Sequence, residues 1–148
     1  HEVSGAVSDG EDMRANSDAE SPYKSLGGPG RIWNAVRYSI RGLAHAVRVE
    51  SAFRQELIGA AILLPLAFVL RLPPLETVAL VGSVVLVLIV ELVNSSIEAA
   101  IDRISFDHHR LSGRAKDLGS AAVFLALLWC ATTWILLAGP ALLHWLEK

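Results

Sequence analysis

Four polar side chains recur at helical spacing inside an otherwise apolar part of the sequence. They are separated by three, four and four residues, and the set is Glu91, Asn94, Glu98 and Asp102. At about 100° per residue they fall within a stripe of roughly 80° on one helix face. A carboxylate in mid-membrane costs roughly 2.5 to 3.5 kcal/mol, so it normally faces a partner, a cavity or a reaction. The stripe is therefore a candidate site for chemistry.

The expected depth of the stripe suits a reaction between a lipid and a water-soluble molecule. If the helix enters the bilayer near Leu75, Glu91 lies about 24 Å along it, near the far edge of a hydrocarbon core roughly 30 Å thick. Glu98 lies about 10 Å further, in the aqueous layer. This geometry favours phosphoryl transfer from a nucleotide to a membrane alcohol, which needs a proton acceptor and cations that neutralise phosphate.

The residue types suggest roles in such a transfer. Glu91, at the interface, is a candidate general base. Glu98 is a candidate magnesium ligand, and Glu50, at a similar depth before the first apolar segment, is a candidate second ligand. Lys116 and nearby arginines could hold phosphate. The alternative is that the stripe only makes hydrogen bonds between helices of a structural bundle.

Three long apolar segments must position these residues. The chain is 53% hydrophobic and only 19% charged, which is too apolar for an ordinary soluble domain. These segments are 57–70, 77–90 and 121–138. The first two need flanking residues to reach the roughly 20 residues that span a bilayer. We expect an all-α membrane protein with transmembrane helices over about 53–71, 75–103 and 115–139.

The N-terminal part has two further segments. Residues 31–50 carry apolar side chains in one arc of roughly 80°, with Arg37, Arg41 and Arg48 elsewhere, so they are expected to form an amphipathic helix on the membrane surface. A soluble helix packed on a core is the alternative. Residues 1–30 hold six acidic and two basic residues among Ser, Gly and Ala, and are expected to be a disordered acidic tail ahead of a membrane domain over 31–148.

Charge and motif content restrict the orientation and the function. Arginines of 31–50, and the basic residues of 103–116, favour a cytoplasmic N-terminus and second loop and a periplasmic C-terminus. Basic residues are too few, and too interrupted by apolar runs, for a nucleic-acid binder. Cys130 is the single cysteine, which excludes an intrachain disulfide. A G-x-x-x-x-G-K-[ST] motif is absent from the sequence, so side chains must hold the phosphates.

Three motifs resemble one known family. Residues 91–103, ELVNSSIEAAIDR, resemble the E-x-x-N-[ST]-x-[IL]-E-x-x-[IV]-D signature of the bacterial integral-membrane diacylglycerol kinases. Residues 52–56, AFRQE, and 111–122, LSGRAKDLGSAA, are similar to the family's other two motifs in the expected order. The resemblance extends over roughly 31–138.

The resemblance implies a homotrimer in the bacterial inner membrane, with a surface helix and three spans in each protomer. It implies transfer of the γ-phosphate of MgATP to diacylglycerol to give phosphatidate. Undecaprenol kinase is the alternative within the same fold, because relatives phosphorylate that polyprenol. A structural or ion-conducting oligomer, with the polar stripe lining a pore, is the alternative from another class.

The resemblance also implies roles for individual residues. The catalytic pair is Glu91, as the base, and Asn94, and the metal ligands are Glu50 and Glu98. The nucleotide-binding residues are Arg31, Tyr38, Glu50, Glu98, Asp107, His108, His109, Lys116 and Asp117. The residues on the side of the lipid substrate are Arg31, Arg54, Gln55, Glu56, Glu91 and Ser120.

Overall fold

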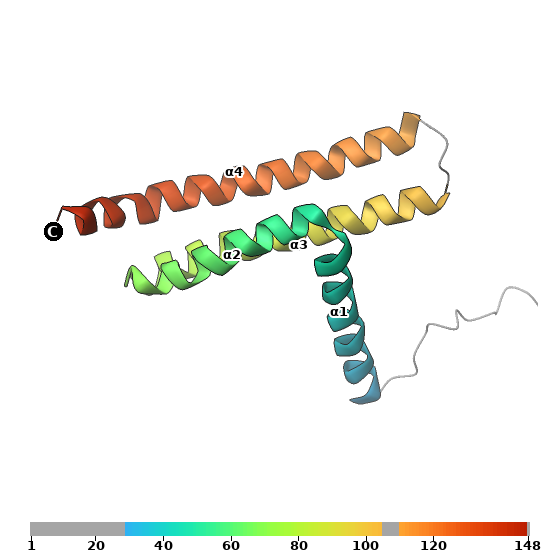
Figure 1. The fold of residues 1–148 in the computed structure, drawn as a ribbon, viewed down its shortest axis with the longest axis horizontal. Helices are drawn as coiled ribbons and strands as arrows, with labels where there is room; N and C mark the ends of the chain where they lie inside the picture. Colours follow the sequence, from blue (N-terminus) through green and yellow to red (C-terminus); the bar gives the residue numbers. More distant parts are fainter. Residues whose placement is uncertain (1–28, 105–109, 148) are drawn as a thin grey trace, which may run out of the picture. The chain divides into compact units, whose positions relative to one another are not determined.

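The computed structural model describes residues 29–104 and 110–147, and all regular structure within them is helical (Figure 1). The helices are α1 (Pro29–Val49), α2 (Ser51–Val69), α3 (Pro74–Ile104) and α4 (Arg110–Leu146). The chain divides into one unit that ends at Ile40 and a second that starts at Arg41. The second unit contains the end of α1 and all of α2, α3 and α4. The expected all-α fold is confirmed.

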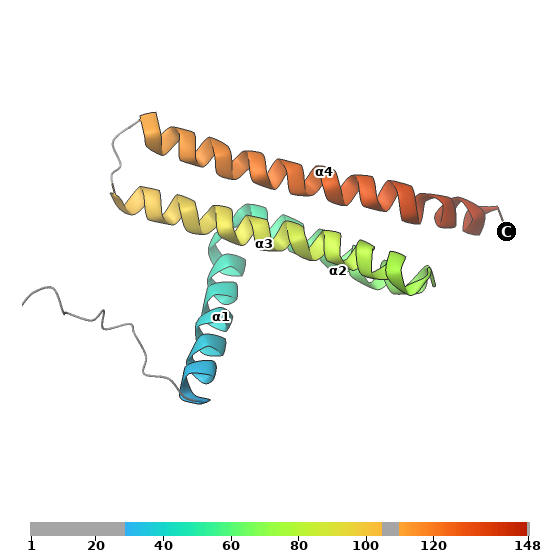
Figure 2. The same cartoon turned by 180° about the vertical axis from the view of Figure 1, so that it is seen from behind.

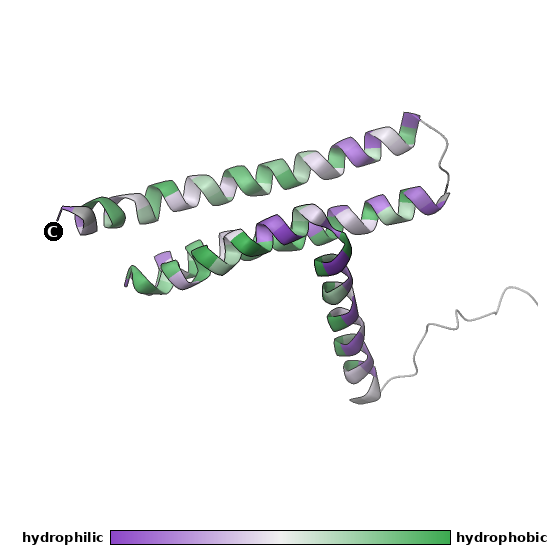
Figure 3. Cartoon of the chain, in the orientation of Figure 1, coloured by the Kyte–Doolittle hydropathy of each residue, from purple (hydrophilic) through white to green (hydrophobic). Residues whose placement is uncertain are grey.

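Helices α2, α3 and α4 are long and apolar enough to cross a membrane, over Ser51–Val69, Pro74–Arg103 and Arg110–Trp145. Pro65 lies inside α2 without ending it, as membrane helices tolerate. Helix α4 extends beyond the expected segment 115–139 at both ends, through Pro140. Polar residues gather where α3 ends and α4 begins (Figure 3). The chain is a membrane protein.

A tight turn joins α2 to α3. Arg71 takes a left-handed backbone conformation with φ of 51°, which reverses the chain within a few residues. Pro74 then opens α3, a position where the missing amide hydrogen costs nothing. The Thr77 hydroxyl donates to the carbonyl oxygens of Leu72 and Pro73, each at 3.3 Å, and so fixes the start of α3.

Helix α3 packs against both α2 and α4 (Figure 2). The buried positions at these contacts are mostly small, and include Ala60, Ala67, Ala126 and Ala138. Small side chains let membrane helices approach closely, which matters because lipid tails provide no hydrophobic drive for helix association. The outward-facing residues of these helices are large and apolar, as a lipid environment requires, and examples are Ile62, Phe68, Leu128 and Ile135.

Candidate active site

The polar stripe of α3 runs from a buried end to an exposed end. Glu91 is 4% exposed and Asn94 9% exposed. Glu98 is half-buried and Asp102 is exposed. The Asn94 side-chain amide donates from Nδ2 to Glu98 Oε1 at 3.3 Å, which links two members of the stripe. A buried carboxylate among apolar side chains requires a functional explanation, since burial without a partner is costly.

Glu50 brings a further carboxylate to this stripe. It is the N-cap residue of α2, but its side chain makes no capping hydrogen bond. The carboxylates of Glu50 and Glu98 both interact electrostatically with that of Glu91. Three negative charges therefore lie near one another at the start of α2 and the middle of α3. Such a cluster is stabilised when a cation binds.

Oxygen ligands of this kind fit a magnesium ion. Among the described residues, no three His, Cys, Asp or Glu side chains lie close enough to hold a metal by themselves. Magnesium needs less than that, because it commonly takes one or two carboxylates and completes its shell with water and substrate phosphates. Glu50 and Glu98 supply hard carboxylate oxygens, and Glu98 is already oriented by Asn94. The donor set thus fits a magnesium ion.

Lys116 of α4 provides positive charge at the exposed end of the stripe. Its Nζ lies 2.6 Å from Asp102 Oδ1, and both side chains are substantially exposed. The same amino group also interacts electrostatically with Glu98. Exposed ion pairs contribute little to stability. Breaking this ion pair would therefore cost little, and the Lys116 amino group could then bind an anionic ligand in place of Asp102.

Gly119 lets α4 approach α3 at Asn94. A Cβ atom at position 119 would overlap Asn94 Oδ1 and lie 3.3 Å from Asn94 Cγ. Asn94 Oδ1 is buried, with no hydrogen-bond partner in the part of the chain that the structure describes. Sequence reasoning gave Gly119 no role. The run of small residues from Gly119 to Ala122 was a signal of close packing, but it did not indicate which helix is contacted.

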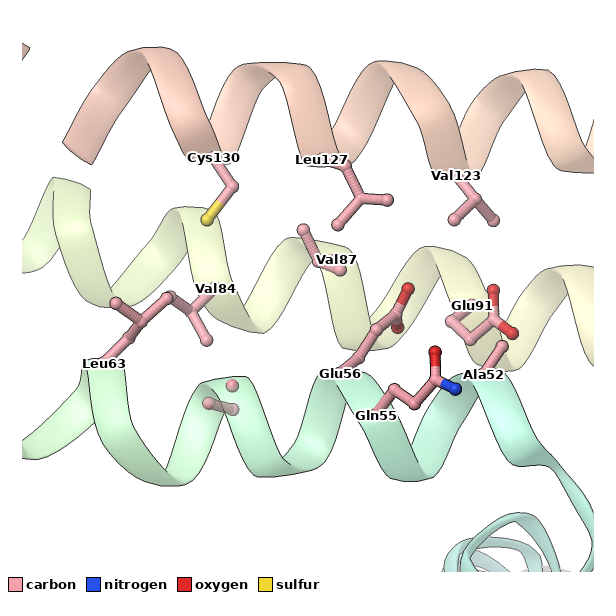
Figure 4. Close-up of a pocket in the computed structure, with 12 residues that line it drawn as sticks. Ala52, Gln55, Glu56, Leu63, Val84, Val87, Glu91, Val123, Leu127 and Cys130 are labelled. Atoms are coloured by element: carbon pink, nitrogen blue, oxygen red, sulfur yellow. The ribbon is translucent and has the colours of Figure 1, made fainter. Parts of the chain in front are cut away.

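A cavity of about 500 Å³ lies between α2, α3 and α4, and Glu91 lines it (Figure 4). Glu56 and Glu91 enter it from α2 and α3, and their charges interact. Glu56 Oε2 is buried without a hydrogen-bond partner among the described side chains. The remaining lining is almost entirely apolar, and consists of Ala52, Gln55, Gly59, Ala60, Leu63, Val84, Val87, Val123, Leu127 and Cys130. Sequence reasoning identified Gln55 and Glu56 but not the apolar lining.

The other expected site residues are placed as follows. Arg54 Nη1 donates to the carbonyl oxygen of Arg48 at 3.0 Å and so caps the end of α1. Asp117 and Ser120 are exposed on α4. Arg31 and Tyr38 belong to the unit that ends at Ile40. Asp107, His108 and His109 lie outside the described residues.

A second cavity, of about 340 Å³, borders Glu50. His45 of α1 and Ser95 of α3 also line it. Sequence reasoning left His45 unassigned, because it belongs neither to the apolar arc nor to the arginine face of its helix. Its position beside Glu50 depends on packing between α1 and α3, which the sequence pattern did not reveal.

Comparison with known proteins identifies the family of this chain. The family model for prokaryotic diacylglycerol kinase matches residues 37–138. A diacylglycerol kinase of Pseudomonas aeruginosa is 46% identical over 114 residues, which is 77% of this chain and 93% of that protein. The diacylglycerol kinase of Escherichia coli strain K12 is 47% identical over 107 residues, covering 72% and 88%. That of Haemophilus influenzae is 46% identical over 112 residues, covering 76% and 94%.

Three apolar helices, an acidic site and these relatives define a membrane-embedded lipid kinase. The family model and the relatives cover most of the chain, including α2, α3 and the greater part of α4. The chain belongs to the prokaryotic diacylglycerol kinase family.

Proposed function

We propose that this enzyme transfers the γ-phosphate of MgATP to 1,2-diacylglycerol, giving phosphatidate and ADP, at the cytoplasmic face of the inner membrane. One observation carries the proposal. Glu91 lines the apolar cavity and also interacts with the carboxylates of Glu50 and Glu98. It therefore stands where a lipid hydroxyl and a nucleotide phosphate can both reach it.

Glu91 acts as the general base in this proposal. Its carboxylate accepts the proton of the lipid hydroxyl while the hydroxyl oxygen forms a bond to the γ-phosphorus. The bond from the γ-phosphorus to the oxygen that bridges to the β-phosphate breaks, and ADP leaves with that oxygen. Surroundings of low polarity favour this role, because a poorly solvated carboxylate accepts a proton more readily than one in water.

Glu50 and Glu98 hold the magnesium ion of the nucleotide. When bound, that ion neutralises phosphate charge and aligns the γ-phosphate. Asn94 acts as a positioning residue, because its amide fixes one oxygen of Glu98. The Lys116 amino group leaves Asp102 and binds a phosphate oxygen of the nucleotide. The other nucleotide contacts in this proposal come from Arg31, Tyr38, Asp107, His108, His109 and Asp117.

Glu56 and Gln55 receive the glycerol part of the lipid in this proposal. The two ester groups of 1,2-diacylglycerol can only accept hydrogen bonds, and the Gln55 side-chain amide would donate to one of their carbonyl oxygens. Arg54, Arg31 and Ser120 complete the lipid side of the site. Arg54 must then leave the carbonyl oxygen of Arg48, to which it donates at 3.0 Å.

The proposed assembly is a homotrimer in which each protomer crosses the membrane three times. The turn at Arg71 then lies on the periplasmic side together with the C-terminus, and the N-terminus lies in the cytoplasm. Helix α1 lies on the cytoplasmic surface with its apolar face toward the lipid. The proposal for the orientation rests on the basic residues at the end of α3 and the start of α4.

Transfer from labelled ATP tests this function. The full chain in mixed micelles with magnesium is offered diacylglycerol and undecaprenol in separate reactions. We expect labelled phosphatidate from the wild type and none above background from Glu91→Ala. A labelled polyprenyl phosphate as the sole product would assign the enzyme as an undecaprenol kinase. Transfer to neither lipid would overturn the proposal.

A further inference from the structure

The cavity that Glu91 lines has a polar end and an apolar end. Gln55, Glu56 and Glu91 lie at one end, and Leu63, Val84 and Cys130 lie at the other (Figure 4). At the apolar end Cys130 is 9% exposed, and its Sγ accepts a hydrogen bond from Ser83 Oγ at 3.6 Å. An apolar pocket with a few polar groups at one end suits an amphiphilic molecule.

The apolar end continues the catalytic stripe of α3 into the membrane. At about 100° per residue, Val84, Val87 and Glu91 fall within roughly 60° on one helix face. Val84 and Val87 are 4% and 5% exposed. The seven residues from Glu91 back to Val84 rise about 10 Å. A chain attached to a molecule whose hydroxyl meets Glu91 would therefore run along this face toward Cys130.

We propose that the cavity seats one acyl chain of the lipid substrate, and that Cys130 marks the depth to which the protein encloses that chain. The inference rests on the proposed function and adds the location of the hydrocarbon. Glu91 is 4% exposed, its side chain makes no hydrogen bond within the part of the chain that the structure describes, and it lines the same cavity as Cys130. The depth of Cys130 is therefore measured from a lipid hydroxyl that is hydrogen-bonded to Glu91.

The depth predicts a threshold in chain length. An extended chain advances about 1.2 Å per bond, so about eight bonds extend from a hydroxyl at Glu91 to the level of Cys130. The glycerol and the ester linkage take about four of these bonds, so about the fifth acyl carbon reaches that level. An acetyl chain, of two carbons, ends well short of the thiol. Carbons beyond about the fifth would lie outside the enclosed part of the cavity.

The unique thiol allows the test to use the unmodified protein. The full chain in detergent micelles is treated with methyl methanethiosulfonate, and modification of Cys130 is followed by mass spectrometry. We expect diacylglycerols with acyl chains of eight or more carbons to slow modification at least about fivefold, and diacetylglycerol, whose chains have two carbons, to leave its rate within twofold. Equal protection by all chain lengths would overturn the proposal. A thiol that never reacts would also overturn it, because a neighbouring copy would then fill the cavity.

A matched pair of variants on α2 tests the same proposal by activity. Gly59 lines the cavity, and a Cβ atom there meets nothing within 4 Å, so Gly59→Leu fills the cavity without a backbone clash. We expect it to lower kcat/KM for dioctanoylglycerol at least about tenfold, since even one methylene matters in a hydrophobic pocket. It should also remove the protection of Cys130.

Ala61→Leu introduces the same side chain two residues away, at an exposed position outside the cavity. We expect its kcat/KM and its thiol protection to stay within twofold of wild type. Equal losses in both variants would overturn the inference. Failure of the wild type to phosphorylate any diacylglycerol would refute the proposed function instead, and thiol protection would still report on the cavity.

Discussion

Gly119 of α4 lies directly against the side-chain amide of Asn94 on α3, with no room for a Cβ atom between them. The same amide donates to Glu98 at 3.3 Å. The packing of two helices and the orientation of a proposed magnesium ligand therefore depend on one side chain.

Gly119→Ala should impair both activity and stability. The added methyl group forces Asn94 to rotate, which breaks its hydrogen bond to Glu98 and moves the reacting groups. Small displacements of this kind lower rates by about ten- to a hundredfold, whereas the overpacking costs about 1–3 kcal/mol. Initial rates of transfer and thermal unfolding in micelles measure the two effects.

Gly113→Ala is the control for that variant, since it lies on the same helix and its new Cβ atom would meet nothing within 4 Å. Alanine is the better helix former by about 0.5–1 kcal/mol, so its unfolding temperature should be equal or higher. Equal activity of the two variants would show that the contact with Asn94 does not matter for transfer.

Glu91→Gln should slow the chemical step and leave the fold intact. General base catalysis typically contributes about 10²–10⁴-fold, and kcat should fall by that amount. The neutral amide also removes a buried charge that lies near Glu50 and Glu98, so the unfolding temperature should not decrease. Single-turnover transfer from labelled ATP measures the step. Glu91→Asp, which keeps the carboxylate but retracts it, should retain intermediate activity. A Gln variant with normal turnover would exclude Glu91 as the base.

The sequence was sufficient to predict the acidic stripe of α3, because polar residues at helical spacing on an apolar helix are conspicuous. The contact face of α4 could not be predicted in the same way. Both its lipid-facing side and its protein-facing side are apolar, as buried Ala126 and exposed Leu128 illustrate. Periodicity then gives no signal for which residues meet α3. The roles of Gly119 and Cys130 therefore emerged only from the packing of the helices.

The contact partners of long polar side chains could not be predicted from the sequence either. Arg54 was assigned to the lipid side through its motif, yet in the structure its guanidinium caps α1 at Arg48. A flexible side chain of this length can reach several partners, and the sequence does not indicate which of them it contacts. The assignment of Arg54 to the lipid stays a prediction.

Glu98→Gln should raise the magnesium requirement. Glutamine keeps the oxygen that accepts from Asn94 but loses the negative charge that binds the ion. Loss of partners outside the first coordination shell already weakens metal binding by about 10–100-fold, so the half-saturating magnesium concentration should rise at least about tenfold. Glu76→Gln, at the opposite end of α3, is the control and should leave it unchanged. Lost activity at every magnesium concentration, with no shift in the midpoint, would contradict a role as ligand.

Lys116→Gln should raise the KM for ATP, because the amino group is expected to leave Asp102 and bind a phosphate oxygen. A charge-assisted hydrogen bond to phosphate is about twice as strong as a neutral one, and an increase of about tenfold is expected. Asp102→Asn breaks the same 2.6 Å ion pair from the other side but leaves the lysine free, so its KM should stay the same or decrease. Initial rates over a range of ATP concentrations compare the two variants. If Lys116 acts only through its pairing with Asp102, both variants will show the same change in KM.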